Sequence, residues 1–314
     1  MPIQTDISWW YWAAFIAIIV VFLSLDLGVF HRKAHSVRFK EALIWTAIWF
    51  FVAMLFAWGL HYLRGQEESL EFLTGYIVEL SLSMDNVFVM ALIFGYFRVP
   101  SAYQHRVLFW GILGALIMRG IMIGAGAVLV RKFEWTLLIF GAFLVFSGVK
   151  MLFSRDEGVD PEKNIMIRLA RKFLPVSADF DAYHFVTTLN HRKVLTPLAL
   201  VLVMVETTDV VFAFDSIPAI FGITTKEFIV FTSNVFAILG LRSLYFVLAG
   251  AISYFQYLKF GLSLVLVFIG VKMLIPAYVH ISVAWSLGVV AGIILISVLA
   301  SLAGTWFQQK HKRK

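Results

Sequence analysis

Six acidic residues lie inside long apolar segments of this 314-residue chain, where charged side chains are otherwise scarce. A carboxylate at the centre of a membrane-spanning helix costs about 2.5–3.5 kcal/mol. Acids in such positions usually face a cavity or a partner, and they mark the path of an ion or a proton. The first candidates for chemistry are therefore Asp26, Glu79, Asp85, Glu206, Asp209 and Asp215.

The spacing of these acids limits how they act together. Glu79 and Asp85 are six residues apart, and the same spacing separates Asp209 from Asp215. On an unbroken helix the two members of each pair point in directions that differ by about 240°. Either the helix breaks, or the two acids of each pair have separate roles. Pro218 favours a break in the second segment, because proline removes a helical hydrogen bond.

The oxygen-rich side chains around the acids favour a hard divalent cation. Carboxylate, amide and hydroxyl oxygens suit Mg²⁺, Ca²⁺ and Mn²⁺. All eight histidines lie outside the predicted membrane core and cysteine is absent, whereas zinc and copper sites normally use His or Cys. The predicted metal ligands are Glu79, Asp85, Asn86, Glu206, Asp209 and Asp215. Glu206 and Asp209 share one helix face, since they are three residues apart.

Five further residues are predicted to support this site. They are Ser216, Asn234, Arg119, Arg242 and Asp26. The two arginines either tether the acids when no ion is bound or pair with helix carbonyls. Two arginines cannot neutralise six acids, so ion pairing alone does not explain the set. Asp26 lies near the end of its segment, where its carboxylate could instead reach interfacial water.

Composition places this chemistry in a membrane. Hydrophobic residues make up 61% of the chain and charged residues 14%, whereas soluble domains average about 45–50% and about 25%. These values exclude an ordinary soluble enzyme and a disordered chain. The net charge of +7 is explained by basic residues on the cytoplasmic side of a membrane protein, so we expect no nucleic-acid partner. Without cysteine there is no disulfide or thiol chemistry.

Nine apolar segments predict an all-α polytopic membrane protein with about nine transmembrane helices. Most segments hold the roughly 20 residues that a bilayer requires. If the N-terminus is outside, most lysines and arginines fall inside, as the positive-inside rule requires. We therefore predict the N-terminus out and the C-terminus in. The spans are 9–30, 42–63, 72–97, 107–130, 134–153, 195–220, 228–252, 260–275 and 283–306.

The sequence contains an internal repeat. Residues 144–152 match residues 266–274 at every position but one, and Arg119 pairs with Arg242 further back. The acids pair in the same order, Glu79 with Asp209 and Asp85 with Asp215. Spans 3–5 therefore repeat as spans 6–8, and the second copy enters the membrane from the opposite side because each copy has three spans. Such inverted repeats are typical of secondary transporters, whose sites lie near the midplane.

The chain divides into five parts on this interpretation. Asp160 followed by Pro161 is typical of a helix start and predicts an amphipathic helix over about 161–174, followed by a hairpin near Asn190. The parts are two N-terminal helices in 1–65, the first repeat in 72–153, a cytoplasmic loop in 154–194, the second repeat in 195–275, and a last helix with a basic tail in 276–314.

Three motifs resemble the signature of the TerC/Alx family of bacterial integral membrane proteins. They are ELSLSMDNVFV at 79–89, ETTDVVFAFDSIPA at 206–219 and FTSNVFAILGLRSLYF at 231–246. The resemblance extends from about residue 10 to residue 306. Members of this family are associated with tellurium resistance, alkaline response and manganese homeostasis. The resemblance implies a multispan protein of the wider LysE-type transporter group. It narrows the expected metal from a hard divalent cation to Mn²⁺.

We predict a transporter of the inner (cytoplasmic) membrane and no enzymatic activity. It would export Mn²⁺ by alternating access, with a proton returning on one carboxylate and no organic cofactor. The expected partners are the metal ion, protons and lipid, and the sequence identifies no protein partner. One alternative is a module that delivers metal or anchors a stress complex through residues 154–194. Another is an intramembrane aspartyl protease, which is disfavoured because Gly-x-Gly-Asp is absent and one dyad does not need six acids.

Overall fold

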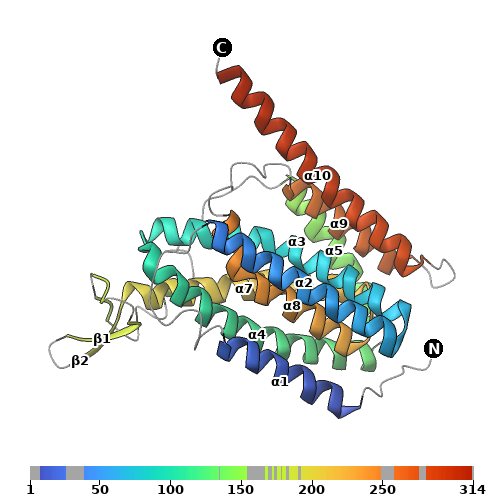
Figure 1. The fold of residues 1–314 in the computed structure, drawn as a ribbon, viewed down its shortest axis with the longest axis horizontal. Coiled ribbons are helices and arrows are strands. Elements are labelled where there is room, and N and C mark those ends of the chain that lie inside the picture. The colour runs from blue at the N-terminus through green and yellow to red at the C-terminus, as the bar shows by residue number, and fades with distance from the viewer. Residues whose placement is uncertain are drawn as a thin grey trace.

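The computed structural model describes residues 8–25, 39–133, 135–153, 192–248, 258–275 and 281–312, together with 167–168, 172, 175–177, 179–181 and 184–189. These residues form nine helices and one two-stranded antiparallel sheet (Figure 1). The elements are α1 (Trp9–Leu25), α2 (Phe39–Arg64), α3 (Gln66–Tyr96), α4 (Ser101–Lys132), α5 (Thr136–Phe153), β1 (Val186–Leu189), β2 (Arg192–Leu195), α7 (Pro197–Phe221), α8 (Glu227–Leu248), α9 (Leu258–Leu274) and α10 (Val283–Lys312).

The predicted all-α polytopic membrane protein is confirmed. Within the described residues, seven helices are long and apolar enough to cross a bilayer, namely α2, α3, α4, α5, α7, α8 and α10. The helices α1 and α9 have 17 residues each. The orientation of the chain in the membrane stays a prediction.

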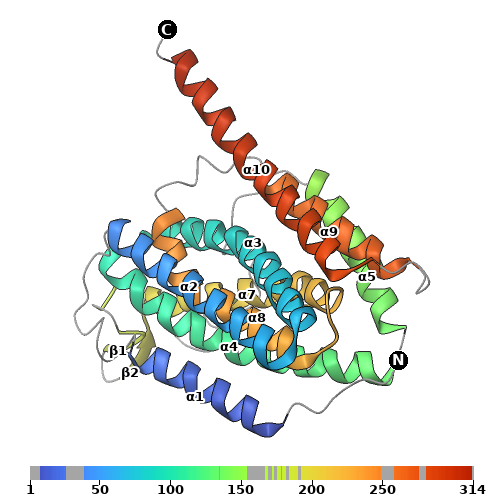
Figure 2. The ribbon, with the colours of Figure 1, turned by 45° about the vertical axis from the view of Figure 1, so that its right-hand side comes forward.

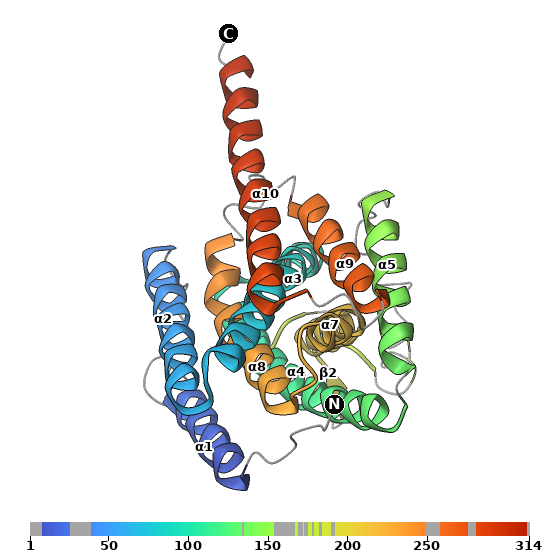
Figure 3. The ribbon, with the colours of Figure 1, turned by 90° about the vertical axis from the view of Figure 1, so that its right-hand side faces the viewer.

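A ring of four helices forms the centre of the fold. Helices α3 and α4 each pack against both α7 and α8. Figure 3 looks nearly along α7, while α5, α9 and α10 are seen from the side. Helix α2 covers α3 and α8, and α1 packs through Phe15 against Phe228 and Phe236 of α8. Within this ring the charged residues Glu79, Arg119 and Asp209 are buried.

Helices α5 and α9 form a close pair beside α10 (Figure 2). Their backbones touch at glycines, because a Cβ on Gly270 would lie 2.7 Å from the carbonyl oxygen of Gly141. A Cβ on Gly148 would lie 2.8 Å from the carbonyl oxygen of Ser263. The alignment that matches 144–152 with 266–274 also matches Gly141 with Ser263 and Gly148 with Gly270.

The alignment of the two copies therefore maps one of these backbone contacts onto the other. It also maps the packing of α3 against α8 onto the packing of α7 against α4. A twofold relation between the two copies would produce this pattern. The inverted orientation of the copies stays a prediction.

The expected helix break at Pro218 is wrong. Helix α7 runs without interruption from Pro197 to Phe221 and contains Pro218. The proline removes only the hydrogen bond that its own N–H would donate to Phe214, and its carbonyl still accepts from the N–H of Gly222 at 3.0 Å. Burial of Ile217 and Ile220 on either side holds this turn in place.

Two sequence predictions fall mainly outside the described residues. Of the amphipathic helix expected over 161–174, the structure describes only Ile167, Arg168 and Lys172. Asp26 also lies outside the described residues. On either side of residues 190–191, β1 pairs with β2 in an antiparallel register. Ile167 is 1% exposed and packs in one cluster with Leu198 and Val201 of α7.

Candidate ionic site in the membrane interior

Arg119 is the centre of a buried ionic cluster. It lies near the middle of α4 and is 1% exposed. Its Nη1 donates to Glu79 of α3. Its Nη2 and Nε donate to Asp209 of α7, at 2.9 Å and 3.2 Å. One guanidinium therefore joins two carboxylates from different helices, as its planar fork of donors permits.

Neutral polar groups surround this cluster, but they leave some of its buried polar atoms without a hydrogen-bond partner. Arg119 Nη1 also lies 3.2 Å from the hydroxyl of Ser216 and 3.5 Å from the amide oxygen of Asn234. The amide nitrogen of Asn86 lies 3.5 Å from Asp209 Oδ1. Among the described residues, three buried atoms here have no hydrogen-bond partner, namely Glu79 Oε2, Asn86 Oδ1 and Asn234 Nδ2. Such atoms are costly to bury unless a further ligand or water satisfies them.

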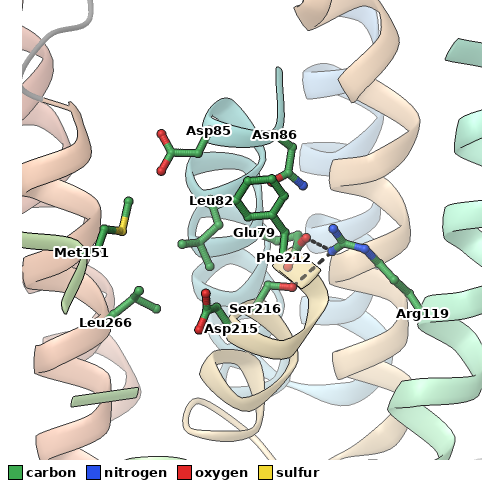
Figure 4. A pocket seen from close by; sticks show the side chains of 10 residues that line it. All are labelled: Glu79, Leu82, Asp85, Asn86, Arg119, Met151, Phe212, Asp215, Ser216 and Leu266. Carbon is green, nitrogen blue, oxygen red and sulfur yellow. Dashed lines mark hydrogen bonds and ion pairs between the residues drawn. The ribbon is translucent and has the colours of Figure 1, made fainter. Parts of the chain in front are cut away.

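Asp85 and Asp215 belong to a second part of the site. Figure 4 shows both carboxylates on the side away from Arg119, toward Met151 and Leu266. A cavity of about 40 Å³ lies between these groups. About 10–15 Å³ of such volume holds one water, so the cavity has room for a small hydrated ion. Glu79, Asn86, Arg119 and Ser216 also line it.

Helix α5 contributes polar groups that the sequence predictions did not include. Ser147 and Lys150 lie close enough to Asp215 to stabilise the charge of its carboxylate. Ser147 is the one position at which residues 144–152 differ from 266–274. The serine at the only mismatch between these two apolar segments could have indicated from the sequence that Ser147 lies near the site.

The structure excludes the helix break, which was one of the two alternatives that the spacing left open. Because α3 and α7 are continuous helices, acids six residues apart face different surroundings. Glu79 and Asp209 face Arg119, whereas Asp85 and Asp215 face away from it. Within the part of the chain that the structure describes, no three Asp, Glu or His side chains form a ready metal centre. The predicted metal ligands therefore stay a prediction.

The other predicted residues lie at or beyond the edge of this site. Glu206 is half-buried on α7, one turn before Asp209. It packs against Gly114 of α4, where any Cβ would overlap the Glu206 carboxylate. Arg242 is half-buried on α8 and is not among the residues that line the cavity.

A second group of charges ties α3 to neighbouring helices near its N-terminus. Lys226, just before α8, lies 3.1 Å from Glu71 and 3.6 Å from Glu68. Arg64 at the end of α2 lies 2.9 Å from Glu68. This group was not found from the sequence, because the sequence could not show that Lys226 folds back onto α3.

A bundle of apolar helices with an arginine–carboxylate cluster in its interior defines a polytopic α-helical membrane protein with an internal ionic site. Comparison with known protein families identifies the family to which this membrane protein belongs. Residues 64–312 match the family described as "Integral membrane protein TerC family". The chain belongs to the TerC family.

Full-length relatives agree with this assignment. The chain is 53% identical over 291 residues to "Uncharacterized membrane protein STKORF319" of Myxococcus xanthus, covering 93% of this chain and 91% of the relative. It is 46% identical to "Putative membrane-bound redox modulator Alx" of Salmonella typhi, with 96% of each chain covered. The protein of the same name in Escherichia coli K12 is 44% identical, again over 96% of each chain. No solved structure matches the chain.

Proposed function

We propose that this protein is a transporter that exports divalent metal cations, above all Mn²⁺, across the inner (cytoplasmic) membrane. The observation that carries the proposal is the cavity to which Asp85 and Asp215 present their carboxylates inside an apolar bundle. Oxygen ligands of this kind suit hard divalent cations. Ionisable groups at such depth normally mark an ion path.

The balance of charge around the cavity supports a divalent cargo. Four acids lie there, namely Glu79, Asp85, Asp209 and Asp215. Arg119 and Lys150 supply the positive charges that act on them. With all six groups ionised the net charge is −2, which one divalent cation neutralises. A proton that returns on one carboxylate would restore part of that balance after the cation leaves.

The names of the relatives suggest an effect on redox state. This chain has no cysteine, so it cannot act through thiols of its own. Movement of manganese, a metal with several oxidation states, offers a route to such an effect that needs no thiol in the transporter. The proposal therefore accommodates the relatives' names without assigning the chain an enzymatic activity.

Flux measurements on the purified full-length protein in proteoliposomes test this proposal. We expect transport of Mn²⁺ above that of Mg²⁺ and Ca²⁺, with a rate that depends on an imposed pH gradient. The Asp85→Asn, Asp215→Asn double variant should lose at least nine-tenths of the flux. Glu67→Gln is a matched control, because Glu67 is also an acid of α3 but is exposed. Wild-type flux from a folded double variant would refute the proposal.

A further inference from the structure

Arg119 and the proposed cargo compete for one carboxylate. We propose that Glu79 is an exchangeable ligand, which pairs with Arg119 when the site is empty and turns to the divalent cation when it is loaded. Arg119 is then a built-in competitor of the cargo, retained on Asp209 throughout. This inference rests on the proposed function and adds to it a mechanism for releasing the cargo.

The two carboxylates hold Arg119 unequally. Asp209 accepts hydrogen bonds from both Nε and Nη2 and therefore binds one edge of the guanidinium in a bidentate manner. Glu79 accepts only from Nη1, which also has Ser216 and Asn234 within reach. Arg119 can therefore release Glu79 and keep both a charged partner and acceptors for its remaining donor. A buried arginine keeps its charge and must keep such a partner.

Glu79 is placed to serve both cations. One oxygen of its carboxylate binds Arg119, and the other, Oε2, has no hydrogen-bond partner among the described residues. The residue is 0% exposed and lines the cavity with Asp85 and Asp215. A cation held by the two aspartates thus meets an unsatisfied oxygen of a carboxylate that is already paired on its other side.

Arg119 and a divalent cation cannot both bind Glu79 tightly at the same time. Oxygen ligands lie about 2.0–2.6 Å from Mg²⁺ or Ca²⁺, which would bring a bound divalent cation within a few ångströms of the guanidinium. Like charges at that distance in an apolar interior repel strongly. Arg119 therefore weakens cargo binding, and in the empty protein it neutralises a buried carboxylate that would otherwise oppose the return of the carrier.

Removal of Arg119 should separate binding from net transport. In the full-length Arg119→Gln variant we expect the Kd for Mn²⁺, measured from the electron paramagnetic resonance signal of free Mn²⁺, to fall at least tenfold. Net efflux into metal-free buffer should fall at least tenfold, because the empty site resets slowly. Exchange of Mn²⁺ for Mn²⁺ across the same vesicles should stay within about twofold of the wild type, since it needs no empty return.

Two controls test whether the effect is specific to Glu79. Arg131→Gln removes another arginine of α4, which is 45% exposed and pairs with Glu227 outside the site. It should change none of the three measurements. In a Glu79→Gln background no carboxylate is contested and only the repulsion by Arg119 remains, so addition of Arg119→Gln should lower the Kd at least threefold less than it does in the wild type.

The proposal can still be tested if the Arg119→Gln variant fails to fold. If Arg119→Gln alone does not fold, the charge-balanced Arg119→Gln, Asp209→Asn variant is compared with Asp209→Asn, and it should bind Mn²⁺ at least tenfold more tightly. Equal or weaker binding after loss of Arg119, or loss of exchange together with net efflux, overturns the inference while the transport function stands. A wild-type protein that neither binds nor moves any divalent cation would instead overturn the proposed function.

Discussion

Neutralisation of Asp209 tests how much the buried cluster contributes to stability. Asp209→Asn preserves the shape of the side chain but leaves one acceptor oxygen in place of two. Arg119 therefore loses one of the two hydrogen bonds that it donates to this residue, and a hydrogen bond to a charged group contributes about 1.5–3 kcal/mol. The full cost of an orphaned buried charge, about 3–5 kcal/mol, is not reached because Glu79 remains paired with Arg119. We expect a loss of about 2–3 kcal/mol.

Thermal unfolding of the full-length protein in detergent measures this loss. The ten tryptophans provide an intrinsic fluorescence signal. At about 2 °C per kcal/mol for a chain of this size, the melting temperature should fall by about 4–6 °C. The exposed control Glu67→Gln should stay within about 1 °C. The Arg119→Gln, Asp209→Asn variant should lose less stability than the sum of its single variants, because each single change leaves a charge behind.

A fall of less than about 1 °C for Asp209→Asn would refute this reasoning. It would mean that Arg119 finds an equivalent partner elsewhere and that the cluster is not a fixed part of the fold. Strict additivity in the double variant would lead to the same conclusion, since coupled residues in one network are not additive.

Three further predictions concern packing and peripheral charge. Gly270→Leu should lower stability by about 1–3 kcal/mol, because the new side chain meets the carbonyl of Gly141; an unchanged melting temperature would contradict the close pairing of α5 and α9. Lys226→Gln should lower stability by about 1–3 kcal/mol, because it leaves the buried carboxylate of Glu71 without its cation; an unchanged melting temperature would contradict this pairing. Ile167→Ala should lower stability by about 2–5 kcal/mol because the residue is buried, with Mn²⁺ flux per folded molecule unchanged; a selective loss of flux would tie the 154–194 loop to transport.

The sequence identified the residues of the site better than their arrangement. Charge is so scarce in the apolar segments that Glu79 and Asp209 stand out from pattern alone. Their shared partner could not be chosen, because the repeat makes Arg119 and Arg242 equivalent in sequence. Only the packing of α4 against α3 and α7 brings the first of them between the two carboxylates.

Helix ends show a second limit of sequence reasoning. The spans were bounded by hydropathy, yet α3 begins at Gln66 and α4 at Ser101, each well before the predicted apolar start. Backbone hydrogen bonding continues a helix into polar surroundings as long as each turn finds acceptors. Pro218 illustrates the converse, since a residue that disfavours helix lies inside α7 where surrounding side chains fix the last turn.

The glycine contacts between α5 and α9 have a mechanical consequence. Where two backbones touch, no side chain lies between them to change rotamer and absorb a displacement, so the pair is stiff against sliding. The cavity lies where Met151 and Leu266 of this pair face Asp85 and Asp215, and the pair contacts α3 and α7 much less extensively than its own members contact each other. Compliance is therefore concentrated at the wall of the ion cavity, and any force that widens the cavity displaces α5 and α9 as one block.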